Sequence, residues 1–483
     1  MKKYIALLLA LVMALSLFAG CAPADGPEET DPTVGGIAES TGVIDTSRDW
    51  WGEDDGKTPI KLRFWAAIDP VYGYQKVCDN FNAAYGDRGL TVEYVQYKND
   101  TNGNLSVDTS LSTGDGIDVL ISYGNLSRLI PRTEQGLLLN LQPYLKDFDI
   151  KAELGEHAAD GGVLGEDGSY HGLITTFTNS SFMLINKDMF EKAGVEIPYD
   201  GWTYSEFLAA CEKLTTKDTK GICWYCSDIS NALTYIRSVV DSNYLYTDET
   251  KNESSFKSDL WTNGLNLLKT TMDNGWACGY GECKTEKHGV ANFLSGECAI
   301  FGLFSQIRQC MDLANYPHDF VTAFVPCPVP DGAEYEQYKS MAHKSTIGEY
   351  VAAAAKTEHP EQCAEFVRWF VQGGMNPTIL AGRYPLWVGN DTKDILATVK
   401  EMVGNTVDTR SLEFLFNCDR SKLPLGDSST TLDKKVRTEL KNAWEGYLIS
   451  GAEQKYKSAE EAMQDAYNKA QDILNAATAD EKK

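Results

Sequence analysis

The chain of 483 residues carries 69 Asp and Glu against 44 Lys and Arg, which gives a net charge of −25. This excess of negative charge excludes a surface adapted to nucleic acid phosphates, which require clustered Lys and Arg. At ~150 residues per domain the length predicts about three domains, and a core of this size requires no metal or disulfide for stability. The 24 Tyr, 18 Phe and 10 Trp are the most informative feature, because such rings bind ligands as well as filling cores.

An apolar segment opens the sequence. Lys2 and Lys3 precede an almost uninterrupted apolar run of 16 residues, residues 4–19. A membrane-spanning helix needs ~20 residues, so this run is typical of the hydrophobic region of a secretory signal peptide. Small residues then precede Cys21, and the arrangement resembles a bacterial lipoprotein cleavage site. The resemblance implies a signal peptide over residues 1–20 and a diacylated Cys21 that anchors the chain at the outer face of the cell membrane.

An acidic stretch follows the cysteine. Residues 22–56 contain ten acidic side chains and one basic side chain, Arg48, among many Gly, Pro, Ser and Thr. Such a segment has little apolar periodicity, and its like charges repel one another. We therefore expect residues 21–56 to be an acidic, flexible tether between the lipid and the folded chain.

Strand and helix patterns then alternate. Apolar residues alternate with polar ones at residues 60–65, 90–95 and 117–121, which predicts three strands, and helical spacing predicts helices over residues 74–85 and 105–111. This β-α-β-α-β order favours a parallel sheet covered on both faces. Ligands of such sheets bind beyond the carboxyl ends of the strands, where the sequence has Trp65, Asp69 and Tyr123.

Several motifs follow one another from residue 168 onward. They are residues 168–174 (GSYHGLI), 182–194 (FMLINKDMFEKAG), 201–207 (GWTYSEF), 293–302 (FLSGECAIFG), 326–332 (PCPVPDG) and 361–367 (EQCAEFV). Thr203 with Glu206, and Ser458 with Glu461, have the spacing of capping boxes that open helices. In this order the motifs resemble the extracellular solute-binding proteins of family 1, the substrate-capturing subunits of ABC importers. The resemblance covers residues 57–475.

The resemblance implies an α/β chain with a two-lobed periplasmic-binding-protein-like fold of type II. The lobes of such a fold are joined by crossing hinge segments, which the motifs place near residues 173–180, 344–350 and 382–387. It further implies that residues 57–176 and 348–384 form the first lobe, and that residues 177–347 and 385–483 form the second. Hinge bending would close the lobes around a ligand.

Side chains at strand ends and crossings are the candidate ligand contacts, because sugar recognition combines ring faces with polar groups in a partly desolvated cleft. They are Trp65, Asp69 and Tyr123, Phe177 in the first crossing, Trp224 and Tyr225 after a strand at residues 220–223, Phe304 after a strand at residues 299–303, and Arg383, Tyr384 and Trp387 in the third crossing. Each ring could instead fill the core or pack a loop, and Asp69 could instead cap a helix.

The sequence gives little support for a metal site, a redox motif or a hydrolytic active site. The six histidines show no metal-ligand spacing, and Cys223-Trp-Tyr-Cys226 lacks the long helix of a thioredoxin motif. A tetrathiolate of Cys223, Cys226, Cys278 and Cys283 has weak spacing, although Cys278 and Cys283 could pair locally. With 69 carboxylates, no glycosidase pair can be singled out. We expect no catalytic residue, no metal and no cofactor.

These patterns together predict a lipid-anchored, extracellular, monomeric substrate-binding subunit of an ABC importer. It would capture a carbohydrate, in particular an oligosaccharide, between two lobes and deliver it to the transmembrane permease. Its membrane contact would be the N-terminal lipid, and nucleic acid is not expected as a partner. Two alternatives stay open: a lipid-anchored glycoside hydrolase, and a binding protein for a non-sugar solute such as a peptide. An anionic ligand would call for cleft cations, for which only Arg383 and Arg308 qualify.

Overall fold

The computed structural model describes residues 36–44, 49–51, 56–123, 126–160, 163–165, 167–179, 182–225, 246–248, 251–286, 289–302, 307–332, 345–416, 419–423, 425 and 431–481. The expected signal peptide, the lipidated Cys21 and the candidate ligand residue Phe304 lie outside these ranges. Among the described helices, none combines the length and the apolar composition needed to cross a membrane.

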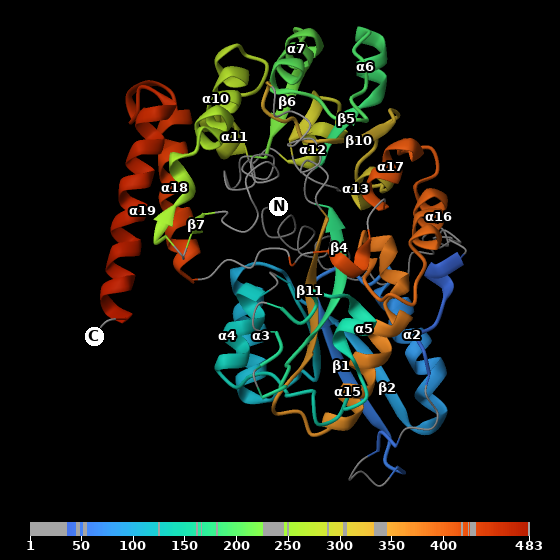
Figure 1. Ribbon diagram of the computed structural model, residues 1–483. Coiled ribbons are helices and arrows are strands. Elements are labelled where there is room, and N and C mark those ends of the chain that lie inside the picture. The colour runs from blue at the N-terminus through green and yellow to red at the C-terminus, as the bar shows by residue number, and fades with distance from the viewer. Residues whose placement is uncertain are drawn as a thin grey trace, which may run out of the picture. The chain divides into compact units, whose positions relative to one another are not determined.

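Two mixed β-sheets organise the described chain (Figure 1). The larger has the order β12-β4-β11-β3-β1-β2, formed by β1 (Ile60–Ala66), β2 (Leu90–Gln96), β3 (Val119–Ser122), β4 (Leu173–Asn179), β11 (Ser345–Ala353) and β12 (Tyr384–Pro385). The smaller has the order β10-β5-β9-β6, formed by β5 (Phe182–Asn186), β6 (Lys220–Trp224), β9 (Cys298–Gly302) and β10 (Thr322–Pro326). A short ribbon pairs β7 (Thr247–Asp248) with β8 (Glu253–Ser254).

Helices surround both sheets. Those that follow strands of the larger sheet or lie in its connections are α2 (Tyr74–Tyr85), α3 (Thr101–Thr113), α4 (Leu126–Glu134), α5 (Ile150–Leu154) and α15 (Pro360–Trp369). Those between strands of the smaller sheet are α6 (Lys187–Ala193), α7 (Tyr204–Leu214), α10 (Asp259–Asp273), α11 (Tyr280–Glu286), α12 (Val290–Leu294) and α13 (Ile307–Met311). The C-terminal part adds α16 (Thr392–Val403), α17 (Thr409–Phe416), α18 (Thr431–Leu448) and α19 (Ala459–Glu481).

The first strands and helix lie where their patterns predict. In β1 the apolar residues Leu62 and Phe64 are buried whereas Lys61 is exposed, and α2 buries its apolar stripe before ending at Gly86. Both β2 and β3 pair with β1 in parallel, which confirms the predicted β-α-β-α-β order. The sheet as a whole is mixed, because β11 joins β3 and β4 in antiparallel orientation.

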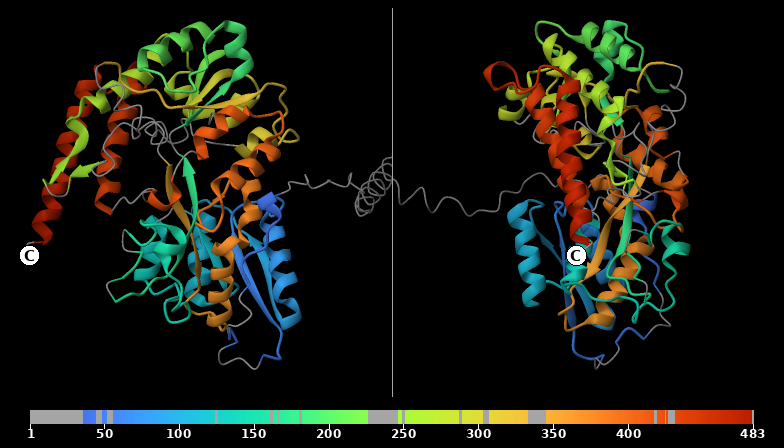
Figure 2. Two further views of the ribbon diagram at one scale, coloured as in Figure 1. Left: turned by 45° about the vertical axis from the view of Figure 1, so that its right-hand side comes forward. Right: turned by 60° about the vertical axis from the view of Figure 1, so that its left-hand side comes forward.

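Helices α2 and α15 pack on one face of the larger sheet, and α3 and α4 lie together on the other side (Figures 1 and 2). On the first face, the Phe64 ring of β1 lies 5.1 Å from Phe366 of α15, and Phe366 lies 5.0 Å from Phe81 of α2. On the other side, the Arg132 guanidinium of α4 forms an ion pair with Asp108 of α3 at 2.7 Å. Aromatic packing therefore fixes the sheet whose strand ends carry the candidate site.

One face of the smaller sheet packs into a second core to which the C-terminal helices contribute, whereas residues such as Leu184 and Phe301 belong to the core of the larger sheet. The predicted capping box of Thr203 and Glu206 is present at the start of α7. At the start of α19, Ser458 accepts a hydrogen bond from the Glu461 N–H, as predicted. The Glu461 carboxylate accepts from the Lys457 N–H instead of the Ser458 N–H, so the second box is incomplete. Helix α19 buries Ala462, Met463, Ala466, Ala470 and Leu474.

The segments expected to cross between lobes are strands of the larger sheet. The chain leaves β4 for β5 of the smaller sheet, and it re-enters the larger sheet at β11 after β10. Strand β4 pairs with both β11 and β12, so the three segments lie side by side. A change in the backbone conformation of these strands would therefore alter the arrangement of both sheets.

Part of the expected tether is folded. Ala38 and Trp50 are buried, and the Trp50 ring stacks on Trp51 with ring centroids 4.5 Å apart. The Trp50 carbonyl accepts a hydrogen bond from Gln362 of α15 at 2.9 Å. Residues 36–44 and 49–51 are thus not a free linker, because apolar side chains in an acidic stretch find a place on the core. The expectation of a flexible tether up to residue 56 is wrong for these residues.

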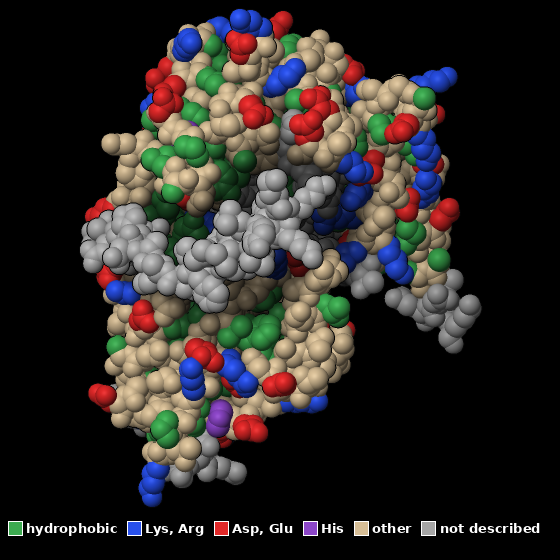
Figure 3. Space-filling view, turned by 180° about the vertical axis from the view of Figure 1, so that it is seen from behind, with side chains coloured by type: hydrophobic (Ala, Val, Ile, Leu, Met, Phe, Trp, Pro, Cys, Tyr) green, Lys and Arg blue, Asp and Glu red, His purple; other side chains and the backbone are tan. Residues whose placement is uncertain are grey.

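Charge is distributed over the surface rather than gathered. On the face shown in Figure 3, acidic and basic side chains are interspersed among uncharged ones. Several described ion pairs have both side chains exposed, such as Lys61 with Glu93 and Lys257 with Glu253. Exposed pairs of this kind stabilise a fold by about 0–1 kcal/mol each, so the two cores dominate its stability.

Candidate ligand site at the strand ends

Two tyrosines join the carboxyl ends of the parallel strands β1 and β3. Tyr123 directly follows β3, and Tyr74 is the first residue of α2. Their hydroxyl oxygens lie 3.2 Å apart, and the Tyr123 hydroxyl also accepts a hydrogen bond from the Ala67 N–H at 3.3 Å. Burial raises the pKa of Tyr74 to about 12 and the pKa of Tyr123 well above its usual value. Both hydroxyls are therefore neutral near pH 7 and can donate and accept hydrogen bonds.

Two further tyrosines come from β2 and the residue that follows it. The Tyr97 hydroxyl donates to the Ile121 carbonyl at 3.2 Å, and the Tyr94 hydroxyl donates to the Ile68 carbonyl. Burial raises the pKa of both phenols. The Tyr97 ring lies 6.3 Å from the Tyr123 ring. The same sheet edge thus presents several rings whose hydroxyls are already tied to the backbone, which makes their positions rigid.

An ion pair lies against these rings. Arg383, just before β12, places its Nε 3.1 Å from the Glu349 carboxylate of β11, with side chains 30% and 19% exposed. The Arg383 guanidinium lies 5.8 Å from the Tyr123 ring centroid, within cation–π range. Burial raises the pKa of Glu349, although Arg383 opposes that effect. We refer to Tyr74, Tyr97, Tyr123, Glu349 and Arg383 as the strand-end cluster.

A second contact involves the loop that follows β1. The Tyr72 hydroxyl donates to the Asp312 carboxylate at 2.7 Å, and the Arg308 guanidinium of α13 lies 4.5 Å from the Tyr72 ring centroid. Burial and the hydrogen bond to Asp312 raise the pKa of Tyr72 to about 12. This contact joins a loop of the larger sheet to the segment that precedes β10 of the smaller one.

The structure brings some of the expected ligand residues together. Tyr123 and Arg383 belong to the strand-end cluster. Phe177 and Tyr384 lie side by side, with ring centroids 5.7 Å apart, and both also pack against Phe416. Both rings are buried, and the buried Tyr384 hydroxyl has no hydrogen-bond partner among the described residues. Phe177 therefore supports the crossing strands rather than facing an open surface.

Three expected residues are engaged in local packing. The Trp65 indole N–H donates to the Gly116 carbonyl at 2.7 Å, and the half-buried ring packs near Tyr97. Asp69 accepts a hydrogen bond from the Val71 N–H at 3.2 Å, which is a turn rather than a helix cap. The Trp387 indole N–H donates to the Glu153 carboxylate of α5 at 2.7 Å. Their possible contact with a ligand stays a prediction.

The two described candidates of the smaller sheet, Trp224 and Tyr225, do not join the cluster. Trp224 is the last residue of β6 and is completely buried, and its indole N–H donates to the Thr271 hydroxyl at 2.9 Å. This burial corrects the expectation that the Trp224 ring faces a ligand, because the ring fills the core between β6 and α10. The half-buried Tyr225 ring lies 6.4 Å from Phe301.

The cluster also contains residues that the sequence did not single out. Tyr74 belongs to the apolar stripe of α2, and its sequence position gives no sign that it meets Tyr123. Glu349 lies inside a crossing strand, and only its place within the expected second crossing, residues 344–350, could have drawn attention to it. Tyr97 follows β2 directly and satisfies the same strand-end rule that selected Tyr123.

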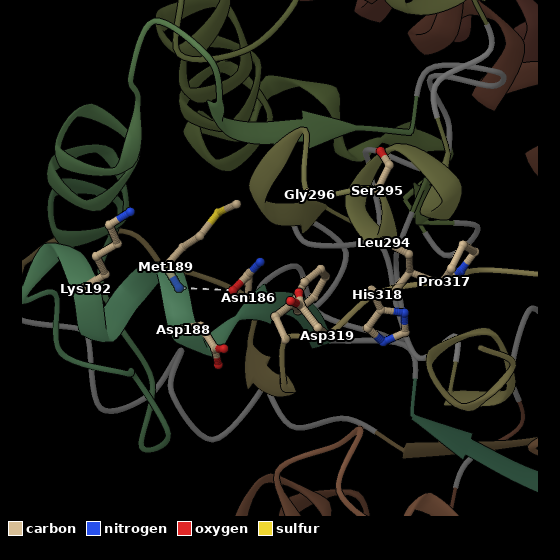
Figure 4. Close-up of a pocket in the computed structure, with 11 residues that line it drawn as sticks. Asn186, Asp188, Met189, Lys192, Leu294, Ser295, Gly296, Pro317, His318 and Asp319 are labelled. Atoms are coloured by element: carbon tan, nitrogen blue, oxygen red, sulfur yellow. Dashed lines mark hydrogen bonds between the residues drawn. The ribbon is translucent and has the colours of Figure 1, made fainter.

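A separate surface pocket of ≈ 350 Å³ lies beside the smaller sheet (Figure 4). It is formed by the start of α6, the end of α12 and the loop at residues 317–320, and it shares no residue with the strand-end cluster. Its polar groups include Asp188, Asp319 and Lys192, which Figure 4 shows on different sides of the pocket. No ligand class follows from this open and mixed lining.

Metal-binding residues do not converge in the part of the chain that the structure describes, where no group of three or more His, Cys, Asp or Glu could hold an ion. Cys226 of the considered tetrathiolate lies outside the described residues. None of the nine described cysteines forms a disulfide, so Cys278 and Cys283 do not pair with each other.

Comparison with known proteins places this geometry in a family. Residues 76–379 match the family described as bacterial extracellular solute-binding protein. The match covers more than half of the chain, and the chain belongs to this family. No curated protein sequence matches it.

Solved structures agree with this assignment at the level of the fold. A sugar transporter from Rhizobium etli in an open conformation superposes with a TM-score of 0.63 at 16% identity, covering 86% of this chain and 99% of that one. An ABC substrate-binding protein from Listeria monocytogenes in complex with cycloalternan gives 0.61 at 17% identity, covering 88% and 99%. The sugar-binding protein MalE from Xanthomonas citri gives 0.60 at 16% identity, covering 88% and 100%. The chain therefore has the expected two-lobed, periplasmic-binding-protein-like α/β fold.

Proposed function

We propose that this solute-binding protein captures a neutral oligosaccharide at the strand-end cluster and delivers it to an ABC permease. The observation that carries the proposal is the Tyr123 ring with Arg383 5.8 Å from its centroid and Glu349 3.1 Å from Arg383. The partly exposed guanidinium can donate to sugar hydroxyls and the carboxylate can accept from them, while the buried Tyr123 ring packs against the guanidinium. The similar structures that were solved as sugar-binding proteins support this ligand class.

A thermal-unfolding screen tests the ligand class. The purified chain would be heated alone and with cycloalternan, maltotetraose or raffinose, because a ligand at ~100 times its dissociation constant stabilises a protein by ~2.7 kcal/mol. We expect at least one neutral oligosaccharide to raise the unfolding midpoint. A response to peptides alone would favour the non-sugar alternative. Chromatography of the same mixtures would detect hydrolysis, and release of shorter sugars would support the glycoside hydrolase.

The ligand would bind without bond-making chemistry and close the two lobes. We infer that residues 57–176 with 348–384, and residues 177–347 with 385–483, are the moving bodies. Only a difference in affinity for the open and closed forms can report occupancy to the permease. Small-angle scattering should show a smaller radius of gyration with bound sugar and a monomeric mass throughout. An unchanged radius at saturation would contradict closure.

Membrane attachment through Cys21 completes the proposal. The apolar run at residues 4–19 followed by a small residue and Cys21 supports a signal peptide of residues 1–20 and diacylation at the cysteine. In cells grown with labelled palmitate, the wild-type chain should carry the label, and Cys21→Ser should lose the label and leave the membrane fraction. Equal labelling of both chains would contradict the assignment of the lipid to Cys21.

A further inference from the structure

Glu349 has an unusual backbone for a residue in a strand. Its φ is 55°, and the only other described non-glycine residue with positive φ is Asn252. The left-handed region costs a residue with a Cβ about 1–2 kcal/mol, and such strain persists only where the surroundings fix it. The Thr175 hydroxyl donates to the Glu349 carbonyl at 3.2 Å, and the Thr176 hydroxyl donates to the Gly348 carbonyl at 2.8 Å.

This backbone is held between two regularly paired neighbours. Gly348 pairs with Thr176 and Tyr350 pairs with Ile174, so the register of β11 and β4 continues through Glu349 without an insertion. A glycine would adopt the same φ without steric cost. The steric cost of a glutamate at this position must therefore be offset by an interaction of its side chain. Its carboxylate lies 3.1 Å from Arg383 Nε.

The carboxylate of Glu349 neutralises the positive charge of Arg383 in the strand-end cluster. Burial alone would lower the pKa of Arg383, but the Glu349 carboxylate together with the nearby Tyr123, Tyr74 and Tyr384 outweighs burial and raises that pKa. The surrounding groups that also face Glu349 electrostatically are the neutral phenols of Tyr74, Tyr97 and Tyr123. The described cluster consequently combines one cation and one anion at 3.1 Å.

Arg308, the second cation considered for binding an anionic ligand, also lies near a carboxylate of this chain. Arg308 lies over the Tyr72 ring, whose hydroxyl donates to Asp312. Burial would raise the pKa of Asp312, but hydrogen bonds from Asn315 and Tyr72 and the charge of Arg308 together lower it. Both arginines that could hold an anionic ligand thus face a carboxylate of this chain.

We propose that Glu349 is a specificity-determining residue, which reserves the Arg383 guanidinium and excludes anionic ligands from the strand-end cluster. The proposal rests on the proposed function, since it defines the ligand of that same site as uncharged. An incoming uronate or other carboxylate would meet the Glu349 charge within a few ångströms, and like charges in a partly desolvated site repel strongly. A neutral sugar hydroxyl instead donates to Glu349 and accepts from Arg383.

The test compares an anionic probe with a neutral one of the same shape. Sodium glucuronate is titrated against the full chain, with glucose plus sodium chloride at equal ionic strength as the control. Glu349→Gln keeps the side-chain shape and removes the charge. We expect this variant to bind glucuronate at least about tenfold more tightly than wild type, since a unit charge at close range contributes more than this factor.

Two further variants keep the result interpretable. Glu349→Gly also removes the carboxylate and suits the positive φ, so it should show the same gain if Glu349→Gln folds poorly. In Glu349→Gln combined with Arg383→Gln the gain should disappear. The proposal is overturned if wild type binds glucuronate as tightly as Glu349→Gln, or if the gain survives in the double variant. This readout needs no sugar to bind wild type, so it is separate from the oligosaccharide screen.

Discussion

The Trp387 indole Nε1 lies 2.7 Å from the Glu153 carboxylate, which also accepts a hydrogen bond from Gln372 at 3.1 Å. In addition, the Val388 N–H donates to the Glu153 carbonyl at 3.0 Å. Glu153 thus joins the segment after β12 to α5 through both its backbone and its side chain. A ring that was expected to stack on a ligand is held in the protein by a charge-assisted hydrogen bond.

Replacing Trp387 by Phe should destabilise the fold by about 1–3 kcal/mol, because the Glu153 carboxylate loses one of its two donors in a partly buried place. Urea unfolding followed by circular dichroism measures the effect. Glu153→Gln is the matched control, since its amide oxygen still accepts from the indole, and its loss should be smaller. If Trp387→Phe leaves stability unchanged but weakens sugar binding, the ring acts on the ligand and the structural interpretation is wrong.

The Arg420 side chain should be essential for the same segment. It donates to the carbonyls of Pro385, Leu386 and Trp387 at 3.0–3.3 Å and to the hydroxyl of Thr392 at 2.9 Å. Arg420→Met removes all of these donors from a buried place, and we expect a loss of about 3 kcal/mol or more in the free energy of unfolding. Lys422→Met, in an exposed pair with Asp419, should change it by less than about 1 kcal/mol. Equal losses in both variants would contradict this role.

Trp224 provides a prediction about stability rather than binding. Trp224→Phe leaves the buried Thr271 hydroxyl without its indole partner and removes part of a core ring. We expect a loss of about 2–4 kcal/mol in unfolding free energy and no change in sugar affinity once the folded fraction is taken into account. Calorimetric titration beside chemical unfolding separates the two quantities. If the variant folds but no longer binds sugar, Trp224 contributes to ligand binding and its assignment to the core alone is wrong.

Acid should weaken the contact between α19 and the segment that precedes it, through Asp465. Burial alone would raise the pKa of this carboxyl, but hydrogen bonds from Lys469, Tyr456 and Lys455 outweigh it and lower the pKa to about 2. Because the folded pKa lies below the unfolded value of ~3.9, the stabilisation is present above about pH 4 and is lost as the pH falls toward 2. About a third of the side chain is exposed, which reduces the contribution to about 1 kcal/mol.

Asp465→Asn should therefore be less stable than wild type by about 1 kcal/mol at pH 7, and the two should converge near pH 2. Urea unfolding at several pH values measures the difference. Asp218→Asn, in a solvent-exposed pair with Lys217, is the control and should follow wild type to within about 1 kcal/mol across the range. A difference that stays constant between pH 7 and pH 2 would show that Asp465 does not act through its charge.

Local periodicity predicted much of the fold. Burial alternates along β1 and recurs at helical spacing along α2, and both elements lie at the predicted residues because one face of each packs on a single core. The folded part of the expected tether shows the limit of this reasoning. Composition cannot reveal that Trp50 is buried through a contact with α15, which lies about three hundred residues later in the sequence.

The candidate site was predictable only in part. Tyr123 and Arg383 were found because position after a strand or in a crossing is visible in the sequence. Trp224 belongs to β6 itself, and since strand side chains alternate between faces, a one-residue error in a strand end reverses the predicted face. Glu349 lies in the expected second crossing, but its left-handed backbone and the hydrogen bond from Thr175 of another strand are not visible in the sequence.

Calorimetric titration of the purified chain with neutral oligosaccharides tests most directly whether the strand-end cluster binds sugar. The wild-type chain should bind one molecule of at least one such sugar, and Arg383→Gln should weaken that binding about tenfold or more while remaining folded, because a charged donor to the ligand is lost. Lys422→Met should bind like wild type. Absence of binding across the panel, or equal affinity in wild type and Arg383→Gln, would contradict the assignment of this site.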